Sequence, residues 1–143
     1  MVVELLKEKD IDKVVKLIEK TCRISFKMYY PQSVIDETIK SLDYDGVKKR
    51  ASWTHFYVVK DGDNGVGCGA IGPYWDSVTE SSLFTIFVDP DYQGKGIGKL
   101  IINTLESDEY FLRSSRVEIP ASVVALPFYI HMGYTHKNGV MTF

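Results

Sequence analysis

The fold of this chain is decided by the stretch Val88-Asp-Pro-Asp-Tyr-Gln-Gly-Lys-Gly-Ile-Gly98. An apolar run over residues 83–88 leads into it and an amphipathic run follows, which is the order of a strand, a tight turn, a glycine-rich loop and a helix. Such a loop leaves backbone N–H groups unpaired at a helix N-terminus, where the helix dipole also favours an anion. Gly94, Gly96 and Gly98 lack the side chains that would keep a phosphate from those amides. The stretch therefore predicts a phosphate or pyrophosphate site.

The spacing of the glycines excludes three common phosphate loops. A Walker loop needs Gly-Lys-Ser/Thr with another glycine five residues earlier, but Leu100 follows Gly98-Lys99 and the earlier position is Gln93. The dinucleotide fingerprint and the kinase glycine loop both need glycine at position 99, which is lysine. An unrelated nucleotide-binding domain is therefore disfavoured.

The remaining pattern is Q-x-x-G-x-G, formed by Gln93, Gly96 and Gly98. It resembles the acetyl-CoA loop of the GCN5-related N-acetyltransferase (GNAT) family, and Val88-Asp89-Pro90 resembles that family's usual lead-in. A second resemblance lies at residues 125–134, which match the family's C-terminal motif A-x-x-F-Y-x-x-x-G-F/Y. The matching residues are Ala125, Phe128, Tyr129, Gly133 and Tyr134. Both motifs stand in the family's order and at its separation, and the resemblance covers nearly the whole chain.

This resemblance implies an α/β (α+β) fold, in which about four helices flank a central mixed, mostly antiparallel sheet of six to seven strands. The sheet is expected to splay between its fourth and fifth strands, and residues 1–143 are expected to form a single N-acetyltransferase domain. The residue pattern indicates strands over 2–6, 56–59, 66–71, 80–88, 116–120 and 140–143. It indicates helices that start at Asp10 and fade near Cys22, that run from Pro31 to Leu42, that start at Ile97, and that cover 123–132. Little sequence follows Gly133, so either the last strand is short or a second copy in a homodimer completes the sheet.

The resemblance also implies that acetyl-CoA is the co-substrate. The residues that it assigns to acetyl-CoA binding are Ile86, Phe87, Val88, Gln93, Gly94, Lys95, Gly96, Ile97, Gly98 and Lys99. The family often has asparagine three residues before the motif alanine, where its amide contacts CoA. Here that residue is Ser122, which can still donate and accept a hydrogen bond but has a shorter reach.

The implied reaction is the direct attack of an amine on a thioester. A lysine-like amine has a pKa of about 10.4, so it must lose a proton before it attacks. By resemblance, Tyr129 donates a proton to the leaving CoA thiolate. Glu80 is the first candidate base, because a period of two places it on the strand face of Phe84 and Ile86. Glu118 is a second candidate, and a chain of water molecules is the alternative.

Acceptor recognition in this family usually comes from the first two helices and the loops beside the fourth and fifth strands. The aromatic residues in those segments are Phe26, Tyr29, Tyr30, Trp53 and Trp75. They do not identify the amine, which is either a small molecule or a protein amine. A catalytically silent acyl-CoA sensor with the same fold is the alternative function.

Bulk composition narrows the partners further. The net charge is −2 and no basic run occurs, so the chain is not expected to bind nucleic acid. Neither the two cysteines nor the three histidines show metal-ligand spacing, so no metal is expected, and the cysteines are typical of reduced core thiols. No signal peptide and no apolar run near the ~18 residues of a membrane helix are present, so a cytoplasmic protein with no membrane association is expected.

Overall fold

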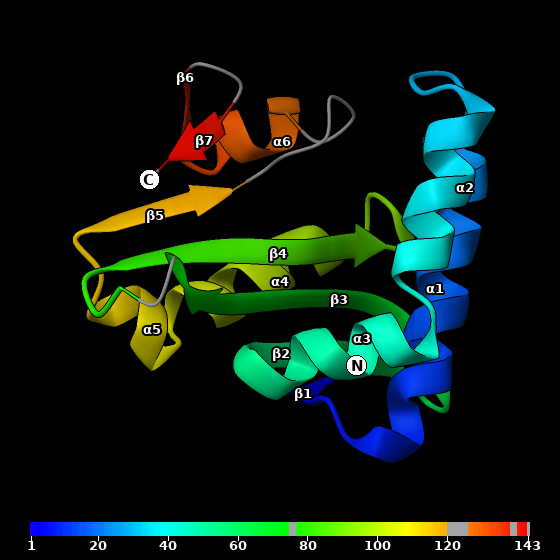
Figure 1. Cartoon of the computed structure of the whole chain (residues 1–143), viewed down its shortest axis with the longest axis horizontal. Helices are drawn as coiled ribbons and strands as arrows, with labels where there is room; N and C mark the ends of the chain where they lie inside the picture. Colours follow the sequence, from blue (N-terminus) through cyan, green and yellow to red (C-terminus); the bar gives the residue numbers. More distant parts are fainter. Residues whose placement is uncertain (75–76, 120–125, 138–139, 143) are drawn as a thin grey trace.

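The structure is a computed structural model that describes residues 1–74, 77–119, 126–137 and 140–142. Its described strands form one seven-stranded sheet in the order β1-β2-β3-β4-β5-β7-β6 (Figure 1). The strands are β1 (Val2–Leu5), β2 (His55–Asp61), β3 (Asn64–Pro73), β4 (Glu80–Val88), β5 (Arg116–Ile119), β6 (Thr135–Lys137) and β7 (Val140–Thr142). The helices are α1 (Ile11–Ser25), α2 (Gln32–Ser41), α3 (Tyr44–Trp53), α4 (Ile97–Glu106), α5 (Glu109–Leu112) and α6 (Leu126–His131), with 3₁₀ turns η1 (Glu8–Asp10) and η3 (Pro90–Tyr92).

Neighbouring strands are antiparallel except for β4 and β5, which run parallel. This parallel pairing covers only Glu80 to Ser82 of β4, against Arg116 to Glu118 of β5. Beyond Ser82 the two strands diverge, and β4 continues to Val88 with β3 as its only strand neighbour in the described residues. The predicted mixed sheet and the splay between the fourth and fifth strands are thus confirmed.

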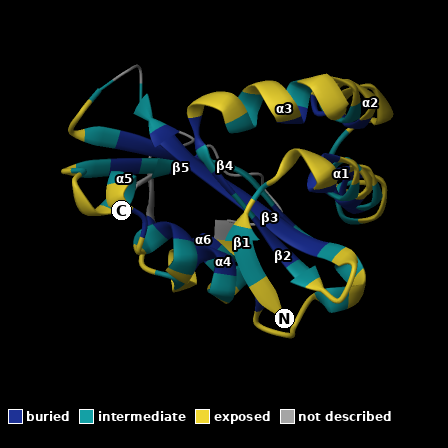
Figure 2. Ribbon diagram, turned by 90° about the horizontal axis from the view of Figure 1, so that it is seen from below, coloured by how far each residue is buried: buried dark blue, intermediate teal, exposed yellow. Residues whose placement is uncertain are grey.

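Two hydrophobic cores lie on opposite faces of the sheet (Figure 2). On one face, α1, α2 and α3 pack against side chains such as Val58, Ala70 and Phe87. On the other face, α4, α5 and α6 cover a second core that includes Leu83 and Tyr129. Both faces are buried, so the central strands follow no simple alternation of apolar and polar residues.

The first helix forms because its apolar residues repeat at helical spacing on one face. Val14, Leu17, Ile18 and Cys22 are at most 3% exposed. Asp10 precedes the helix as predicted, but its carboxylate does not cap it. The carboxylate instead binds Lys60 Nζ at 3.0 Å, which ties the start of α1 to β2.

The helix α4 packs unusually closely on β3, because β3 has glycine where the two elements meet. A Cβ atom at Gly69 would lie 2.6 Å from Ile101 Cγ2, and one at Gly67 would lie 2.8 Å from Ile97 Cγ2. Real Cβ atoms do not approach other atoms so closely. These glycines therefore bring the N-terminal end of α4, and with it the glycine loop, close to the sheet.

Three elements were not predicted from the sequence. The helix α3 has weak amphipathicity and buries only Val47, although Asp43 caps it by accepting a hydrogen bond from the Gly46 N–H at 2.9 Å. The helix α5 is a single turn capped by Asp108, and β6 pairs with β7 to complete the sheet edge. The predicted homodimer stays a prediction. None of the described helices is both long and apolar enough to cross a membrane.

Substitution of Gly69 by alanine is expected to destabilise the protein by about 1–3 kcal/mol, because the added methyl group overpacks the contact with Ile101. Urea unfolding measures the change. Asn103→Ala, on the exposed face of the same helix, is the matched control and should change stability little. A Gly69→Ala protein as stable as the wild type would show that α4 can shift away from β3 at no cost.

Candidate functional site

A β-bulge interrupts β4 where the splay begins to widen. Phe84 pairs with Ala70 and Phe87 pairs with Cys68, so β4 uses three steps where β3 uses two. Within the bulge Thr85 has φ 54°, which is strained for a β-branched residue. The bulge reverses the faces of the strand beyond it, so Phe84 and Phe87 belong to the α1–α3 core, whereas Ile86 belongs to the α4 core. The prediction that Glu80, Phe84 and Ile86 share one face is therefore wrong at Ile86.

The bulge is held by side chains on both sides of it. Arg50 Nη1 donates to Thr85 Oγ1 at 2.8 Å, and Cys68 Sγ donates to the Thr85 carbonyl at 3.2 Å.

Both cysteines of the chain are free and buried. Burial raises the pKa of Cys68 to about 12 and that of Cys22 to about 11.

The turn that precedes the glycine loop is anchored to α1. Lys20 Nζ lies 2.8 Å from Asp89 Oδ1 and 2.7 Å from Asp91 Oδ2, and these two hydrogen-bonded carboxylates raise the pKa of the ammonium. The Asp89 carboxylate also accepts from the Asp91 N–H at 2.9 Å, which fixes the 3₁₀ turn η3. The loop therefore leaves β4 in a defined direction.

The three glycines of the loop have different roles. Gly94 and Gly96 both have φ +79°, a conformation that glycine adopts without strain, and nothing lies within 4 Å of a Cβ atom built on either of them. A Cβ atom at Gly98 would instead lie 3.1 Å from the Phe128 ring, so this glycine allows α6 to approach α4. The first hydrogen bond at the start of α4 runs from the Leu100 N–H to the Gly96 carbonyl. The N–H groups of residues 97–99 precede that bond, so they have no intrahelical acceptor and are available to an anion.

A cavity of about 480 Å³, here called the loop cavity, lies at the N-terminal end of α4. Its lining comes from α1, β4, the glycine loop and α6, and it includes Gln93, Gly94, Gly96, Ile97, Gly98 and Lys99. Lys99 contributes a positive charge. Most of the predicted CoA-loop residues are thereby brought together around one cavity.

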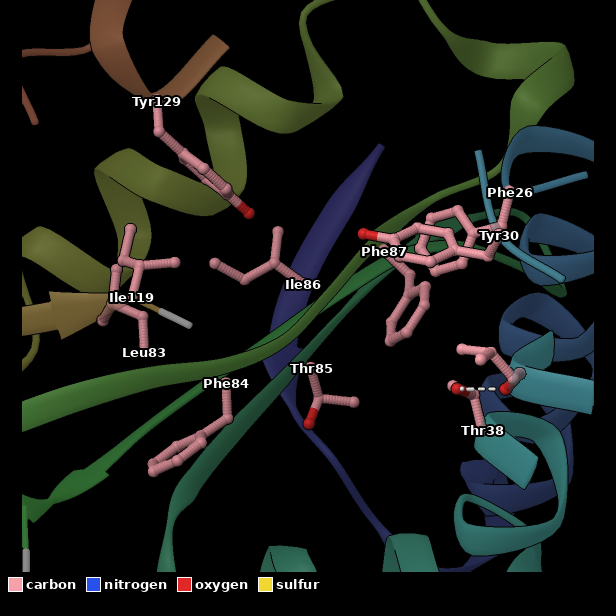
Figure 3. Close-up of a pocket in the computed structure, with 11 residues that line it drawn as sticks. Phe26, Tyr30, Thr38, Leu83, Phe84, Thr85, Ile86, Phe87, Ile119 and Tyr129 are labelled. Carbon is pink, nitrogen blue, oxygen red and sulfur yellow. Dashed lines mark hydrogen bonds between the residues drawn. The ribbon is translucent and has the colours of Figure 1, made fainter. Parts of the chain in front are cut away.

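A second cavity of about 300 Å³, here called the β4 cavity, lies over the bulge (Figure 3). Its lining residues are Phe26, Tyr30, Val34, Thr38, Leu83, Phe84, Thr85, Ile86, Phe87, Ile119 and Tyr129. Phe26, Ile86, Phe87 and Tyr129 also line the loop cavity, so the two cavities meet at these residues. The meeting point lies beside the edge of β4 that β5 leaves unpaired.

Tyr129 reaches this meeting point from α6. Its side chain is only 4% exposed, and Figure 3 shows its hydroxyl directed toward Ile86. The hydroxyl makes no hydrogen bond to any residue in the described ranges. Burial raises the pKa of the phenol above its usual value, so Tyr129 is protonated at neutral pH and can act as a proton donor.

Neither candidate base is among the residues that line the loop cavity or the β4 cavity. Glu80, at the start of β4, lies 3.5 Å from Arg116 Nη1, and Glu118 on β5 binds Nη2 of the same arginine. The ion pairs hold both carboxylates at the paired end of β4, on the far side of the bulge from the glycine loop. The role of either glutamate as the base stays a prediction.

The remaining predicted residues divide into three groups. Phe26 and Tyr30 line the β4 cavity, but Tyr29 is 57% exposed and lines neither cavity, and Trp53 packs edge-on against Phe84. Lys95 lies over the Tyr92 ring at 5.1 Å and is not a lining residue. Trp75 and Ser122 lie outside the described residues.

Sequence reasoning missed Thr85, Thr38 and Arg50. Thr38 and Thr85 line the β4 cavity, and Arg50 lies behind Thr85 on the unpredicted helix α3. A bulge at a β-branched residue has no signal in the hydrophobic pattern, and α3 could have been found only from its Asp43 cap.

Comparison with known proteins agrees with this geometry. Residues 52–136 match the profile of the acetyltransferase (GNAT) domain. An uncharacterized N-acetyltransferase of Methanocaldococcus jannaschii is 29% identical over 150 residues, which cover 92% of this chain and 59% of that protein. The chain thus spans about three fifths of the length of this curated relative.

Solved structures share the same fold. The PaiA N-acetyltransferase of Thermoplasma acidophilum, in complex with coenzyme A, is similar with a TM-score of 0.83 at 14% identity, covering 99% of this chain and 98% of that one. A GNAT family acetyltransferase of Brucella melitensis, in complex with acetyl-CoA, gives a TM-score of 0.73 at 16% identity, with 99% and 86% covered. At these identities the likeness establishes the fold.

The dihedral angle of Gly96 predicts the stability of loop variants. Gly96→Ala should cost roughly 1–2 kcal/mol, because an L-residue is strained at positive φ even where space is open. Gly96→Asn should cost less, since asparagine tolerates this conformation better. Thermal unfolding of both variants measures the difference. Equal stability of wild type and Gly96→Ala would mean that the loop adopts another conformation in solution.

Proposed function

The chain belongs to the GNAT acetyltransferase family, and we propose that it transfers the acetyl group of acetyl-CoA to a primary amine by direct attack. The observation that carries the proposal is the meeting of two cavities at Tyr129, beside the unpaired edge of β4. One cavity has the features of a phosphate site and the other has space for an acceptor. We further propose that residues 1–143 act as one catalytic domain.

Acetyl-CoA would occupy the loop cavity. Its phosphates would accept hydrogen bonds from the amides at the start of α4, with Lys99 adding positive charge. The pantetheine arm carries amide groups, which can pair with the free edge of β4 as an added strand would. The similar Thermoplasma and Brucella proteins hold coenzyme A and acetyl-CoA, which supports the choice of cofactor.

The thioester would then lie at the meeting point of the cavities. The nitrogen lone pair of the neutral amine attacks the carbonyl carbon, and a backbone N–H of the unpaired β4 edge stabilises the oxyanion. The carbon–sulfur bond breaks as the tetrahedral intermediate collapses. The sulfur takes a proton from the Tyr129 hydroxyl, and the proton lost by the amine leaves through water and restores the phenol. Because water carries the proton away from the amine, this mechanism does not need a carboxylate base in the β4 cavity.

A screen for thiol release tests the proposal. Acetyl-CoA is mixed with the protein and a panel of primary amines, and free CoA thiol is measured together with the acetylated product. Transfer to at least one amine is expected. CoA binding without transfer to any amine would support the sensor alternative.

Calorimetry with CoA and ATP should show binding of CoA and no comparable binding of ATP. Gly96→Asn should weaken CoA binding, because it places a side chain in the loop cavity, and its thermal unfolding gives the matching measure of folding. ATP binding tighter than CoA binding would contradict the assignment of the loop.

Tyr129→Phe should lower kcat roughly 100- to 10,000-fold and leave acetyl-CoA binding nearly unchanged. The phenol acts only as the thiolate leaves, and phenylalanine keeps the packing beside Phe128. Single-turnover kinetics and CoA calorimetry measure the two effects separately. Wild-type turnover by the variant, with chemistry rate-limiting, would make Tyr129 a packing residue. An equal loss of binding and rate would make it a cofactor contact.

A further inference from the structure

The turn before the glycine loop carries two carboxylates close to the proposed phosphate site. Asp89 precedes the 3₁₀ turn η3 and Asp91 lies within it, and residues 92–94, which follow directly, all line the loop cavity. Two chain residues span at most about 7 Å, so the backbone of Asp91 lies near the lining residue Gln93. Negative charges at this place would repel a phosphate that enters the cavity.

Lys20 of α1 offsets part of this charge. Its Nζ lies 2.8 Å from Asp89 Oδ1 and 2.7 Å from Asp91 Oδ2, so one ammonium bridges both carboxylates. Among the residues that the structure describes, Lys20 is the only cation that forms an ion pair with either aspartate. The bridge therefore halves the negative charge that the turn would otherwise present.

The bridge lies beside the loop cavity. Thr21, the residue after Lys20, lines this cavity, and its hydroxyl lies 3.4 Å from the Val88 carbonyl that it donates to. The Asp89 side chain is 11% exposed, whereas that of Asp91 is 74% exposed and is held by Lys20. Without the ammonium, the Asp91 carboxylate would be free to turn toward the cavity.

We propose that Lys20 is a positioning residue for acetyl-CoA, because its ammonium holds the carboxylates of the turn in place and reduces their repulsion of the phosphates. Lys20 is not among the residues that line the loop cavity, so it would act through the turn. The inference rests on the proposed acetyl-CoA site and adds to it a residue that the glycine-loop pattern does not contain.

The test compares two acetyl donors that differ in their phosphates. S-Acetylpantetheine has the thioester arm of acetyl-CoA and no phosphate. Lys20→Met should lower kcat/KM for acetyl-CoA about 3- to 10-fold, mainly through KM, because partly screened charges repel with energies of this order. It should leave kcat/KM for acetylpantetheine nearly unchanged. Lys16→Met removes an equal charge from an exposed position on the same helix and should change neither value.

Calorimetry with CoA measures the same effect without turnover. Lys20→Met should bind CoA about 3- to 10-fold more weakly than the wild type, and added salt should reduce this difference, since salt screens exposed charges. Lys20→Arg keeps the charge and should bind CoA as the wild type does. The double variant Lys20→Met, Asp91→Asn lacks one of the unpaired carboxylates and should recover part of the lost affinity. Thermal unfolding should change little in these variants, because surface ion pairs contribute little to stability.

Asp91→Asn keeps the inference testable if Lys20→Met does not fold. The Asp91 side chain is largely exposed, and its substitution leaves Lys20 paired with Asp89. The turn then carries less negative charge, so this variant should bind CoA at least as tightly as the wild type. Weaker binding would overturn the inference.

The outcomes separate the two proposals. Wild-type affinity of Lys20→Met for CoA would overturn the role of Lys20 and leave acetyl transfer intact. An equal loss of kcat/KM with acetyl-CoA and acetylpantetheine would also overturn it, because the loss would then not depend on the phosphates. Failure of the wild type to bind CoA would instead overturn the proposed function.

Discussion

The strand β4 has a complete set of strand neighbours only over its first residues. Since β5 pairs with it from Glu80 to Ser82 and then turns away, the backbone from Leu83 to Val88 has one unpaired edge in the described residues. Buried backbone groups need partners, so this edge is stable only where water or a ligand can reach it. Both cavities open along it, and α6 contributes Tyr129 to the gap that the splay creates. The site is thus a consequence of where two strands part.

The strand β4 and the glycine loop could be predicted because residues close together in the sequence determine them. The bounds of β4 were predicted as Glu80 to Val88, because apolar residues and flanking turn residues mark both ends. The glycine loop was predicted because its spacing excludes other phosphate loops. Gly94 and Gly96 do have positive φ. The need for glycine at position 98 comes instead from the close approach of Phe128, which is distant in sequence.

Features that depend on tertiary contacts were not predictable. The bulge at Thr85 inserts one residue, and the period-of-two argument for Glu80 fails beyond it, since a shift of one residue exchanges the faces of a strand. The helix α3 lacks a strong apolar face, so its only local signal was the cap at Asp43. The hydrogen bond between Arg50 and Thr85 depends on both features, because Arg50 lies on α3 and Thr85 lies in the bulge.

The burial of the two cysteines affects how readily their thiols react with a thioester. A domain that holds a thioester at high local concentration also exposes its own nucleophiles to acylation. Cys68 lies directly behind the bulge, yet its pKa of about 12 keeps it a thiol, which is a far weaker nucleophile than a thiolate. Cys22 is protected in the same way. At neutral pH both cysteines are therefore weak nucleophiles.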